Sequence, residues 1–365
     1  MVASSLVNSK NICISLIIPI FNSEKYISQC LDKLINQTLK NIEILCIDYG
    51  SMDGSKKLIK EYSKSDSRIK LFECNHINIA RNIGINESRG EYILFLNPED
   101  WIYINSCERL HDELIENPCD ILFFKSSLFK ESDEKIYKNS EESDIESIQY
   151  FVESNVFDYY DIGDKIFSLP FTLYNKIFNR QFLLNNNLIF QSDNFCDFTF
   201  FFKTVLNARR LKIFNKHIYI KRDCHNEVSL EYFKEIITDL ENLQDYFKSL
   251  DNYYLFEKKL LNFIINHIHS IYLNNIGKQN EFYLIINEFF KSIKQDKSNY
   301  VKYISNLDNK SLFFFRDVLE SETNSEYRLL VKYNHLLHEN GKLKSEIFEL
   351  KNEINQLKSK LEYFE

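Results

Sequence analysis

The architecture follows from residues 15–55, which read SLIIPIFNSEKYISQCLDKLINQTLKNIEILCIDYGSMDGS. Two continuous apolar, β-branched runs, residues 12–18 and 42–47, are typical of strands that are buried on both faces. Between them, apolar side chains recur at helical spacing from Tyr26 to Ile35. A strand, a helix and a second strand joined by short loops predict an α/β fold, with a mostly parallel sheet and helices on both faces.

The same alternation continues along the chain. We predict further strands at residues 68–72, 92–96, 120–125 and 213–221, and helices at residues 54–63, 80–88, 105–116, 175–187 and 198–208. Polar clusters at residues 48–51 and 97–100 directly follow two of the strands. Because ligands of such sheets bind beyond the carboxyl ends of the strands, we expect both clusters on one rim.

The C-terminal part has a different pattern. Residues 230–320 keep a helical spacing of apolar side chains, and a heptad repeat follows. Its two core series are Leu336, Leu343, Leu350 and Leu357, and Asn340, Ile347, Ile354 and Leu361. Leu at position d and Ile at position a predict a parallel two-stranded coiled coil and hence a homodimer, with Asn340 fixing the register. An amphipathic helix packed on its own domain is the alternative.

These patterns divide the chain into five segments. We predict a polar tail at residues 1–11, two halves of one α/β domain at 12–105 and 106–229, a helical subdomain at 230–322 and the coiled coil at 326–365.

Composition excludes several classes of protein. The 365 residues carry a formal net charge of −8, which argues against a nucleic-acid binder. The eight cysteines form no CxxC pair, so we expect neither a disulfide framework nor a zinc site. Free cysteines of this kind are typical of proteins in the reducing cytosol. No apolar run reaches the roughly 20 residues of a membrane-spanning helix. We therefore expect a cytoplasmic protein, at most peripherally attached to the inner face of the cell membrane.

Four stretches together resemble the family 2 glycosyltransferases. They are residues 15–55, ARNIGINESRGEYILFLNPEDW (80–101), LYNKIFNRQFLLNNNLIF (173–190) and FCDFTFFFKTVLNARRLKIF (195–214). The resemblance implies a GT-A fold, in which residues 12–105 bind a nucleotide-sugar and residues 106–229 bind the acceptor. It also implies an inverting, hexosyltransferase-type reaction with Mg²⁺ or Mn²⁺ as cofactor. A hard cation held by carboxylates would neutralise the leaving nucleoside diphosphate.

The resemblance assigns nucleotide-sugar binding to residues near the first strands. Asp48 matches the first Asp of the family's Asp-Asp-Gly-Ser turn, although an Asp in a turn also caps it. Phe21 and Glu24 match the loop that frames the base, where a packing residue and a helix-start carboxylate are the alternatives. Arg81 matches an Arg directed towards the nucleotide, or forms a surface ion pair. Tyr49 departs from the pattern by replacing the second Asp.

The largest departure is at residues 97–100, Asn-Pro-Glu-Asp, where the family has Asp-x-Asp-Asp. Asn97 replaces an Asp that meets the ribose, and an amide still forms hydrogen bonds to hydroxyls. Glu99 replaces the metal-binding Asp but keeps an oxygen ligand. Asp100 is intact, so we expect the metal at Glu99 and Asp100.

The expected general base is Asp197, which matches the Asp of the family's Glu-Asp pair; an Asp capping a helix start is the alternative. Cys196 replaces the neighbouring Glu. Lys176 and Arg222 are candidates to face the diphosphate or an acidic acceptor, although surface cations are commonly only solvated.

Two functions fit these residues. The first is an active transferase that builds a surface glycan, such as a capsule or a lipid-linked saccharide, including lipooligosaccharide. The second is a degraded GT-A relative that acts as a binding or scaffolding subunit through its coiled coil, which Tyr49, Asn97, Glu99 and Cys196 favour. A P-loop kinase and a dinucleotide oxidoreductase are disfavoured, because neither glycine-rich loop is present.

Overall fold

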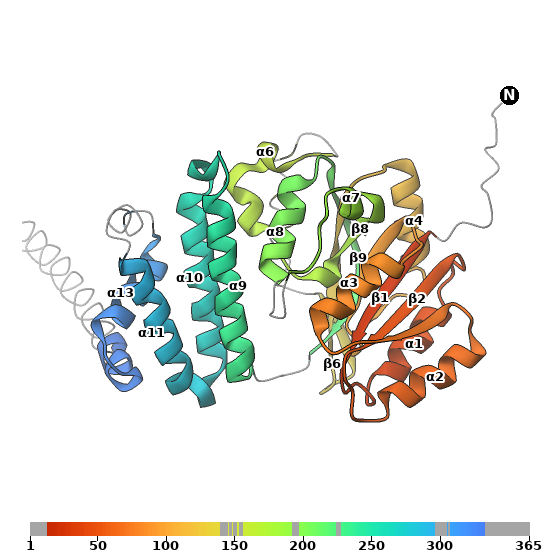
Figure 1. The fold of residues 1–365 in the computed structure, drawn as a ribbon, viewed down its shortest axis with the longest axis horizontal. Helices are drawn as coiled ribbons and strands as arrows, with labels where there is room; N and C mark the ends of the chain where they lie inside the picture. The colour runs from red at the N-terminus through yellow and green to blue at the C-terminus, as the bar shows by residue number, and fades with distance from the viewer. Residues whose placement is uncertain are drawn as a thin grey trace, which may run out of the picture. The chain divides into compact units, whose positions relative to one another are not determined.

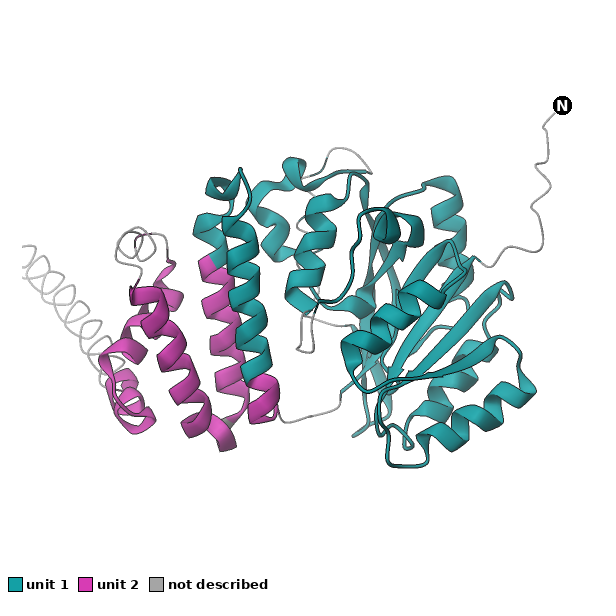
Figure 2. Cartoon of the chain, in the orientation of Figure 1, with its two compact units in different colours: residues 1–227, 234–260 teal, residues 228–233, 261–365 magenta. Residues whose placement is uncertain are grey.

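The computed structural model describes residues 13–138, 156–191, 197–223, 228–295 and 307–332, together with positions 145, 148, 152 and 305. The chain forms two compact units (Figure 2). The first unit comprises residues 1–227 and 234–260, and the second comprises residues 228–233 and 261–365.

The first unit is built on one mixed sheet (Figure 1). Among the described residues it has nine strands in the order β3-β2-β1-β4-β8-β6-β9-β5, with β7 paired to β6. The strands are β1 (Ile14–Ile20), β2 (Ile42–Asp48), β3 (Ile69–Glu73), β4 (Tyr92–Phe95), β5 (Trp101–Ile102), β6 (Ile121–Lys130), β7 (Lys135–Lys138), β8 (Lys176–Asn179) and β9 (Leu211–Arg222).

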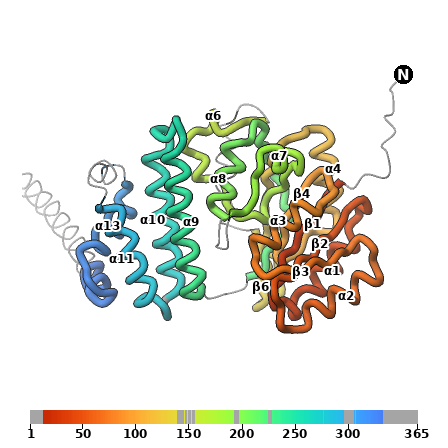
Figure 3. The backbone as a smooth tube through the Cα atoms, viewed as in Figure 1, coloured from red at the N-terminus to blue at the C-terminus, as the bar shows by residue number. Residues whose placement is uncertain are grey.

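The predicted parallel arrangement is confirmed for β3, β2, β1 and β4, whose neighbouring positions can be followed in Figure 3. Beyond β4 the sheet is mixed, because β8 runs antiparallel to both of its neighbours, β4 and β6. The predicted boundary between residues 105 and 106 lies within the unit that this one sheet holds together.

The helices match the predicted pattern in the first half of the chain. Those of the described residues are α1 (Ile27–Ile35), α2 (Ser55–Ser65), α3 (Ile77–Glu87), α4 (Ser106–Glu116), α6 (Tyr159–Ile162), α7 (Arg180–Asn185), α8 (Asp197–Asn207), α9 (Leu230–Lys248), α10 (Glu257–Asn274), α11 (Gln279–Gln295) and α13 (Asn309–Glu320).

The predicted helix at residues 175–187 is wrong in its first part. Lys176–Asn179 form strand β8, and the helix α7 begins only at Arg180. Pairing with β4 and β6 outweighs the local helical spacing, because strand formation depends on partners that are distant in the sequence. The Asn179 side chain then caps α7 by accepting a hydrogen bond of 2.9 Å from the Phe182 N–H.

Helices cover both faces of the sheet, as predicted. Leu16 and Ile18 of β1 belong to one core cluster with apolar residues of α1, α2 and α4. Ile17, between them, points to the opposite face because side chains alternate along a strand. There α3 approaches closely: a Cβ on Gly84 would lie 2.4 Å from the Ile17 Cγ2, so only glycine fits.

The second unit consists of helices in its described part, which confirms the prediction of a helical region after residue 230. Stacked and tilted aromatic rings pack it, including Phe233 on Phe282 at 4.2 Å and Phe290 on Phe315 at 4.7 Å between centroids. In the described part of the chain, no helix combines the length and the apolar composition needed to cross a membrane. The heptads from Leu336 onwards lie outside the described residues.

Candidate active site

Asp48 ends β2 and sits at the turn that was predicted to bind the nucleotide. Its Oδ1 accepts hydrogen bonds from the Gly50 N–H at 3.2 Å and the Ser51 N–H at 3.1 Å. Gly50 has a φ of 112°, a conformation that glycine adopts without strain. The Asp48 Oδ2 is buried and has no hydrogen-bond partner among the described residues. One oxygen therefore holds the turn, and the other has no hydrogen-bond donor within the described part of the chain.

Phe21 and Glu24 follow β1 on the same rim. The Phe21 ring is 48% exposed and stacks on Tyr49, with 5.2 Å between the ring centroids and 15° between their planes. Glu24 Oε2 accepts a hydrogen bond of 2.8 Å from the Gly54 N–H. Phe21 thus presents an open aromatic surface, whereas Glu24 ties the loop after β1 to the start of α2.

The loop after β4 carries Asn97, Glu99 and Asp100. Asp100 is buried, and both of its carboxylate oxygens accept hydrogen bonds. Oδ1 accepts from the Arg222 backbone N–H at 2.8 Å. Oδ2 accepts from the Tyr219 hydroxyl at 2.7 Å and from Asn97 Nδ2 at 2.9 Å. Asp100 therefore fixes the loop to β9.

Glu99 is partly buried beside this network. Burial and the neighbouring Asp100 charge raise the pKa of Glu99 to about 7, against the lowering effect of Arg222. A carboxyl whose ionised form is disfavoured in this way gains from a nearby cation.

The Arg222 side chain packs against the loop after β4. Its Nε donates to the Glu99 carbonyl at 3.0 Å, its Nη1 donates to Glu131 at 2.7 Å, and its Nη2 contacts Gln29. The guanidinium also lies about 5 Å from three aromatic ring centroids, those of Tyr26, Trp101 and Phe129. Arg222 thus joins α1, β6 and the loop after β4.

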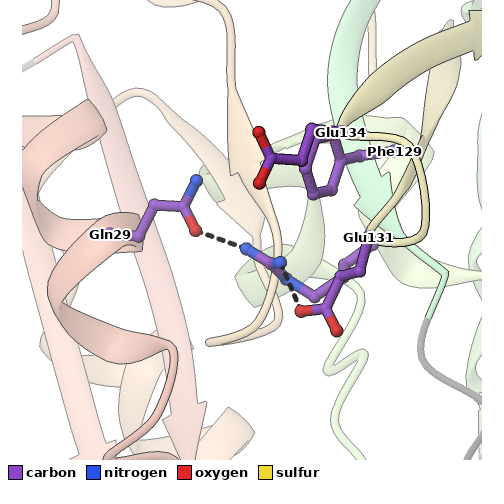
Figure 4. Close-up of a pocket in the computed structure, with 5 residues that line it drawn as sticks. Gln29, Phe129, Glu131 and Glu134 are labelled. Carbon is purple, nitrogen blue, oxygen red and sulfur yellow. Dashed lines mark hydrogen bonds and ion pairs between the residues drawn. The ribbon is translucent and has the colours of Figure 1, made fainter.

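A pocket of about 470 Å³ opens over the Arg222 guanidinium (Figure 4). Its lining is formed by Gln29, Phe129, Glu131, Glu134 and Arg222. Two of these five side chains are carboxylates, and Figure 4 shows the hydrogen bonds from Arg222 to Gln29 and Glu131. In this arrangement the Arg222 charge is balanced within the protein.

Asp197 is the first residue of α8 and forms an ion pair with Arg81 of α3. Arg81 Nη1 contacts Oδ1, and Nη2 donates to Oδ2 at 3.3 Å. The guanidinium also lies 4.9 Å from the Phe190 ring centroid. The two predicted residues, 116 positions apart in the sequence, therefore lie together.

The Tyr49 hydroxyl is influenced by the charges of Asp48, Glu99 and Arg81. Burial and the Glu99 and Asp48 carboxylates, opposed by the Arg81 charge, together raise the pKa of Tyr49 to about 12. The Tyr49 hydroxyl therefore lies within electrostatic range of these three charges. Asp48 and the loop after β4 thus lie on one rim, as predicted from the strand ends, and the charge of Arg81, which pairs with Asp197, acts on the same hydroxyl.

Lys176 begins β8 beside the carboxyl end of β4, because β8 runs antiparallel to β4. Its side chain is fully buried, and its ammonium donates to Asn175 Oδ1 at 2.7 Å and contacts the Thr172 carbonyl. The ammonium also lies 4.8 Å from the Phe201 ring centroid, in a cation–π contact beneath α8. Lys176 therefore fixes β8 to α8 in this structure.

Sequence reasoning missed Tyr219, the buried hydroxyl that holds Asp100. The Asn97 N–H also donates to the Tyr219 Oη at 3.1 Å, so this one side chain positions two residues of the loop. The signal available in the sequence was weak: a Tyr within a predicted strand is ordinarily a packing residue.

Few carboxylates at this rim are available to a divalent metal. The described residues contain no group of three or more His, Cys, Asp or Glu side chains placed to hold one. Both oxygens of Asp100 accept hydrogen bonds from the protein. Of the two predicted metal ligands, Glu99 is therefore the carboxylate that is available to a metal. Mg²⁺ is commonly held by one or two carboxylates together with substrate phosphates, so the residues fit a metal that arrives with a diphosphate.

Comparison with known proteins gives one family. Residues 15–181 match the family model described as Glycosyl transferase family 2. Glycosyltransferase GlyA of Streptococcus pneumoniae serotype 4 is 38% identical over 126 residues, which are 34% of this chain and 18% of GlyA. The uncharacterized glycosyltransferase EpsJ of Bacillus subtilis is 27% identical over 248 residues, 66% of this chain and 69% of EpsJ. The chain thus spans less than a fifth of GlyA.

Solved structures of S. aureus TarS have the same fold. TarS 1-349 in complex with UDP superposes with a TM-score of 0.60 at 17% identity, covering 88% of this chain and 91% of that one. TarS 1-349 in complex with UDP-GlcNAc gives a TM-score of 0.58 at 19% identity, covering 85% and 91%. The first unit has the GT-A fold, as the sequence resemblance implied.

Proposed function

We propose that this chain, whose residues 15–181 belong to glycosyl transferase family 2, moves a sugar from a nucleotide-diphosphate sugar to a glycan or lipid-linked acceptor of the cell surface. The observation that carries the proposal is that Asp48 and the loop with Glu99 lie at the carboxyl ends of β2 and β4, the two parallel neighbours of β1, with the Arg81–Asp197 ion pair formed between α3 and α8. A donor site at this rim is supported by the GT-A fold and by the UDP and UDP-GlcNAc complexes of TarS.

In this proposal the nucleoside lies between the Phe21 ring and the Asp48 carboxylate. Phe21 offers an exposed ring to the base, and the buried Asp48 Oδ2 accepts from an N–H or O–H of the nucleoside. Such a bond to a charged group contributes roughly 1.5–3 kcal/mol. Asn97 has an amide at the same rim, suited to sugar hydroxyls.

Asp197 acts as the general base of an inverting single displacement. Its carboxylate takes the proton of the acceptor hydroxyl, whose oxygen forms a bond to C1 of the sugar. The bond from C1 to the diphosphate oxygen breaks, and the electron pair leaves with the nucleoside diphosphate. Arg81 orients the carboxylate through its ion pair. Glu99 would hold Mg²⁺ or Mn²⁺, which neutralises charge on the leaving diphosphate.

Release of nucleoside diphosphate from a panel of nucleotide-sugars, with and without Mn²⁺, tests the proposal. Asp197→Asn is expected to lower turnover by about 100-fold or more, with nucleotide affinity within about threefold of wild type. The matched control is Asp66→Asn, which weakens the Asp66–Arg68 ion pair at a similar exposure and leaves turnover unchanged. Chelation of the metal should lower turnover at least about tenfold. Turnover that survives Asp197→Asn contradicts the assignment.

The binding or scaffolding subunit is a second candidate. It is favoured by the Asp100 carboxylate, whose oxygens are both engaged, and by Tyr49, which stands where the family has an Asp. A dimer through residues 326–365 would then present two nucleotide sites. Nucleotide binding that needs no metal and leads to no turnover with any donor supports this candidate over the transferase.

A further inference from the structure

Asp239 is a buried carboxylate that the proposed reaction leaves unused. It lies on α9, within the first unit, and its side chain has no exposed surface. Its oxygens accept hydrogen bonds from the Phe198 N–H at 2.9 Å and from the Thr199 N–H at 3.3 Å. The Thr199 hydroxyl donates in return to the Asp239 carbonyl at 3.2 Å. Figure 1 shows α8 and α9 beside one another.

These contacts are made at the N-terminal turn of α8. The first four N–H groups of a helix have no partner within the helix, and a capping side chain commonly comes from the residue just before it. Here a carboxylate from another helix accepts from two of them. Because Asp197 directly precedes Phe198, the backbone that carries the general base is fixed by Asp239.

Asp197 is thus held from two sides. Arg81 contacts its carboxylate, and Asp239 holds the peptide groups that follow it. Burial, with a smaller contribution from the Asp197 charge, raises the pKa of Asp239 to about 7, so the two carboxylates lie within electrostatic range. A buried carboxylate beside a second one is unfavourable unless its hydrogen bonds offset the cost, as they do here.

We propose that Asp239 is a positioning residue, which sets the first turn of α8 and thereby the place of the Asp197 carboxylate. This inference rests on the proposed role of Asp197 as general base. A displacement of about 1 Å in a catalytic group can lower turnover by about 100-fold, whereas donor binding at Asp48 and Phe21 does not depend on α8.

The chain supplies a matched control at the other end of the same helix. Asp120 is also buried, and its Oδ2 accepts from the Arg209 and Arg210 backbone N–H groups, each at 3.0 Å, just after α8 ends, while its Oδ1 accepts from the Arg210 guanidinium at 2.8 Å. Both aspartates therefore hold two backbone N–H groups next to α8. With 11 residues at about 1.5 Å each, the ends of α8 are roughly 16 Å apart, so Asp120 is remote from the base.

The experiment compares Asp239→Asn and Asp120→Asn in the full chain. In Asp239→Asn an amide turns towards one of the two N–H groups, and in Asp120→Asn the ion pair with Arg210 is weakened, so both variants are expected to lose thermal stability. Asp239→Asn should lower kcat about tenfold or more with the donor KM within about twofold. Asp120→Asn should leave kcat within about twofold. In an Asp197→Asn background, Asp239→Asn should add less than about twofold, since its effect acts through the base.

Three outcomes overturn the inference: an unchanged kcat in folded Asp239→Asn, an equal loss of kcat in Asp120→Asn, or a full additional loss in the double variant. If Asp239→Asn does not fold, Thr199→Val decides. It removes the 3.2 Å bond to the Asp239 carbonyl at the same junction and is expected to lower kcat a few-fold with KM unchanged. An inactive wild type, or an active Asp197→Asn, instead marks failure of the proposed function itself.

Discussion

The turn after β2 and the loop after β4 contain one aspartate each, Asp48 and Asp100, with the same exposure of 1%. Their hydrogen bonds differ. Asp48 accepts only from its own turn and keeps a buried oxygen without a partner among the described residues. Asp100 accepts from three donors, two of which come from β9.

Asp48 is held by its own turn and by the Lys56 ammonium at 4.0 Å, all through Oδ1. Under the proposed function, Oδ2 can therefore bind the nucleoside without weakening the turn. Asp100 is held by residues about 120 positions away, and it joins the loop after β4 to the second half of the sheet. Burial raises the pKa of Asp100 and its three hydrogen bonds lower it, so each of these bonds offsets part of the cost of burying the carboxylate. We therefore expect that replacing Asp100 lowers the free energy of unfolding more than replacing Asp48.

The largest expected effect is the loss of stability in Asp100→Ala. Removal of the carboxylate leaves the Arg222 N–H, the Tyr219 hydroxyl and Asn97 Nδ2 without their acceptor. The free energy of unfolding should fall by about 3 kcal/mol, measured by urea denaturation. The corresponding Asp48→Ala should lose only about 1 kcal/mol, because its N–H partners lie in a partly exposed turn. Equal losses would show that the two regions do not differ in this way.

The next effect concerns nucleotide affinity. Asp48→Asn keeps an oxygen for the Gly50 and Ser51 N–H groups but replaces the free Oδ2 by an amide donor. We expect stability within about 0.5 kcal/mol of wild type and a loss of affinity for the nucleoside diphosphate of about 10- to 100-fold, which corresponds to about 1.4–2.8 kcal/mol. Calorimetric titration measures the affinity. Unchanged affinity would mean that the buried oxygen does not contact the nucleotide.

The same contrast explains what could be predicted from the sequence. The parallel strands and the two strand-end clusters follow from local patterns, because buried β-branched runs and turn residues occur within a few positions of one another. β8 could not be found in this way. Its strand conformation depends on pairing with β4 and β6, which are distant in the sequence, and the buried position of Lys176 depends on that pairing.

In the candidate site, too, the residues in local motifs could be predicted, and those that act through distant contacts could not. Asp48 and Arg81 could be named as candidates because they lie in recognisable stretches, whereas Tyr219 and Asp239 act through contacts between elements. Asp239 did leave a signal: it lies three positions after Ile236 and four before Leu243, within the apolar stripe of α9. A charged residue on such a stripe needs a buried partner, which here is the N-terminal turn of α8.

The smallest expected effect is the loss of stability in Tyr219→Phe, which removes one of the three donors to Asp100. Tyr219→Phe removes one donor to Asp100 Oδ2 and the acceptor of the Asn97 N–H, but it keeps the ring that stacks on Tyr174 with 5.0 Å between centroids. The free energy of unfolding should fall by about 1 kcal/mol, a third of the loss in Asp100→Ala, since two of the three donors to Asp100 remain. Nucleotide affinity should stay within about threefold of wild type, because the hydroxyl orients the loop without contacting the ligand. A loss of affinity as large as that of Asp48→Asn would instead place the Tyr219 hydroxyl in the nucleotide site and remove the distinction between the two regions.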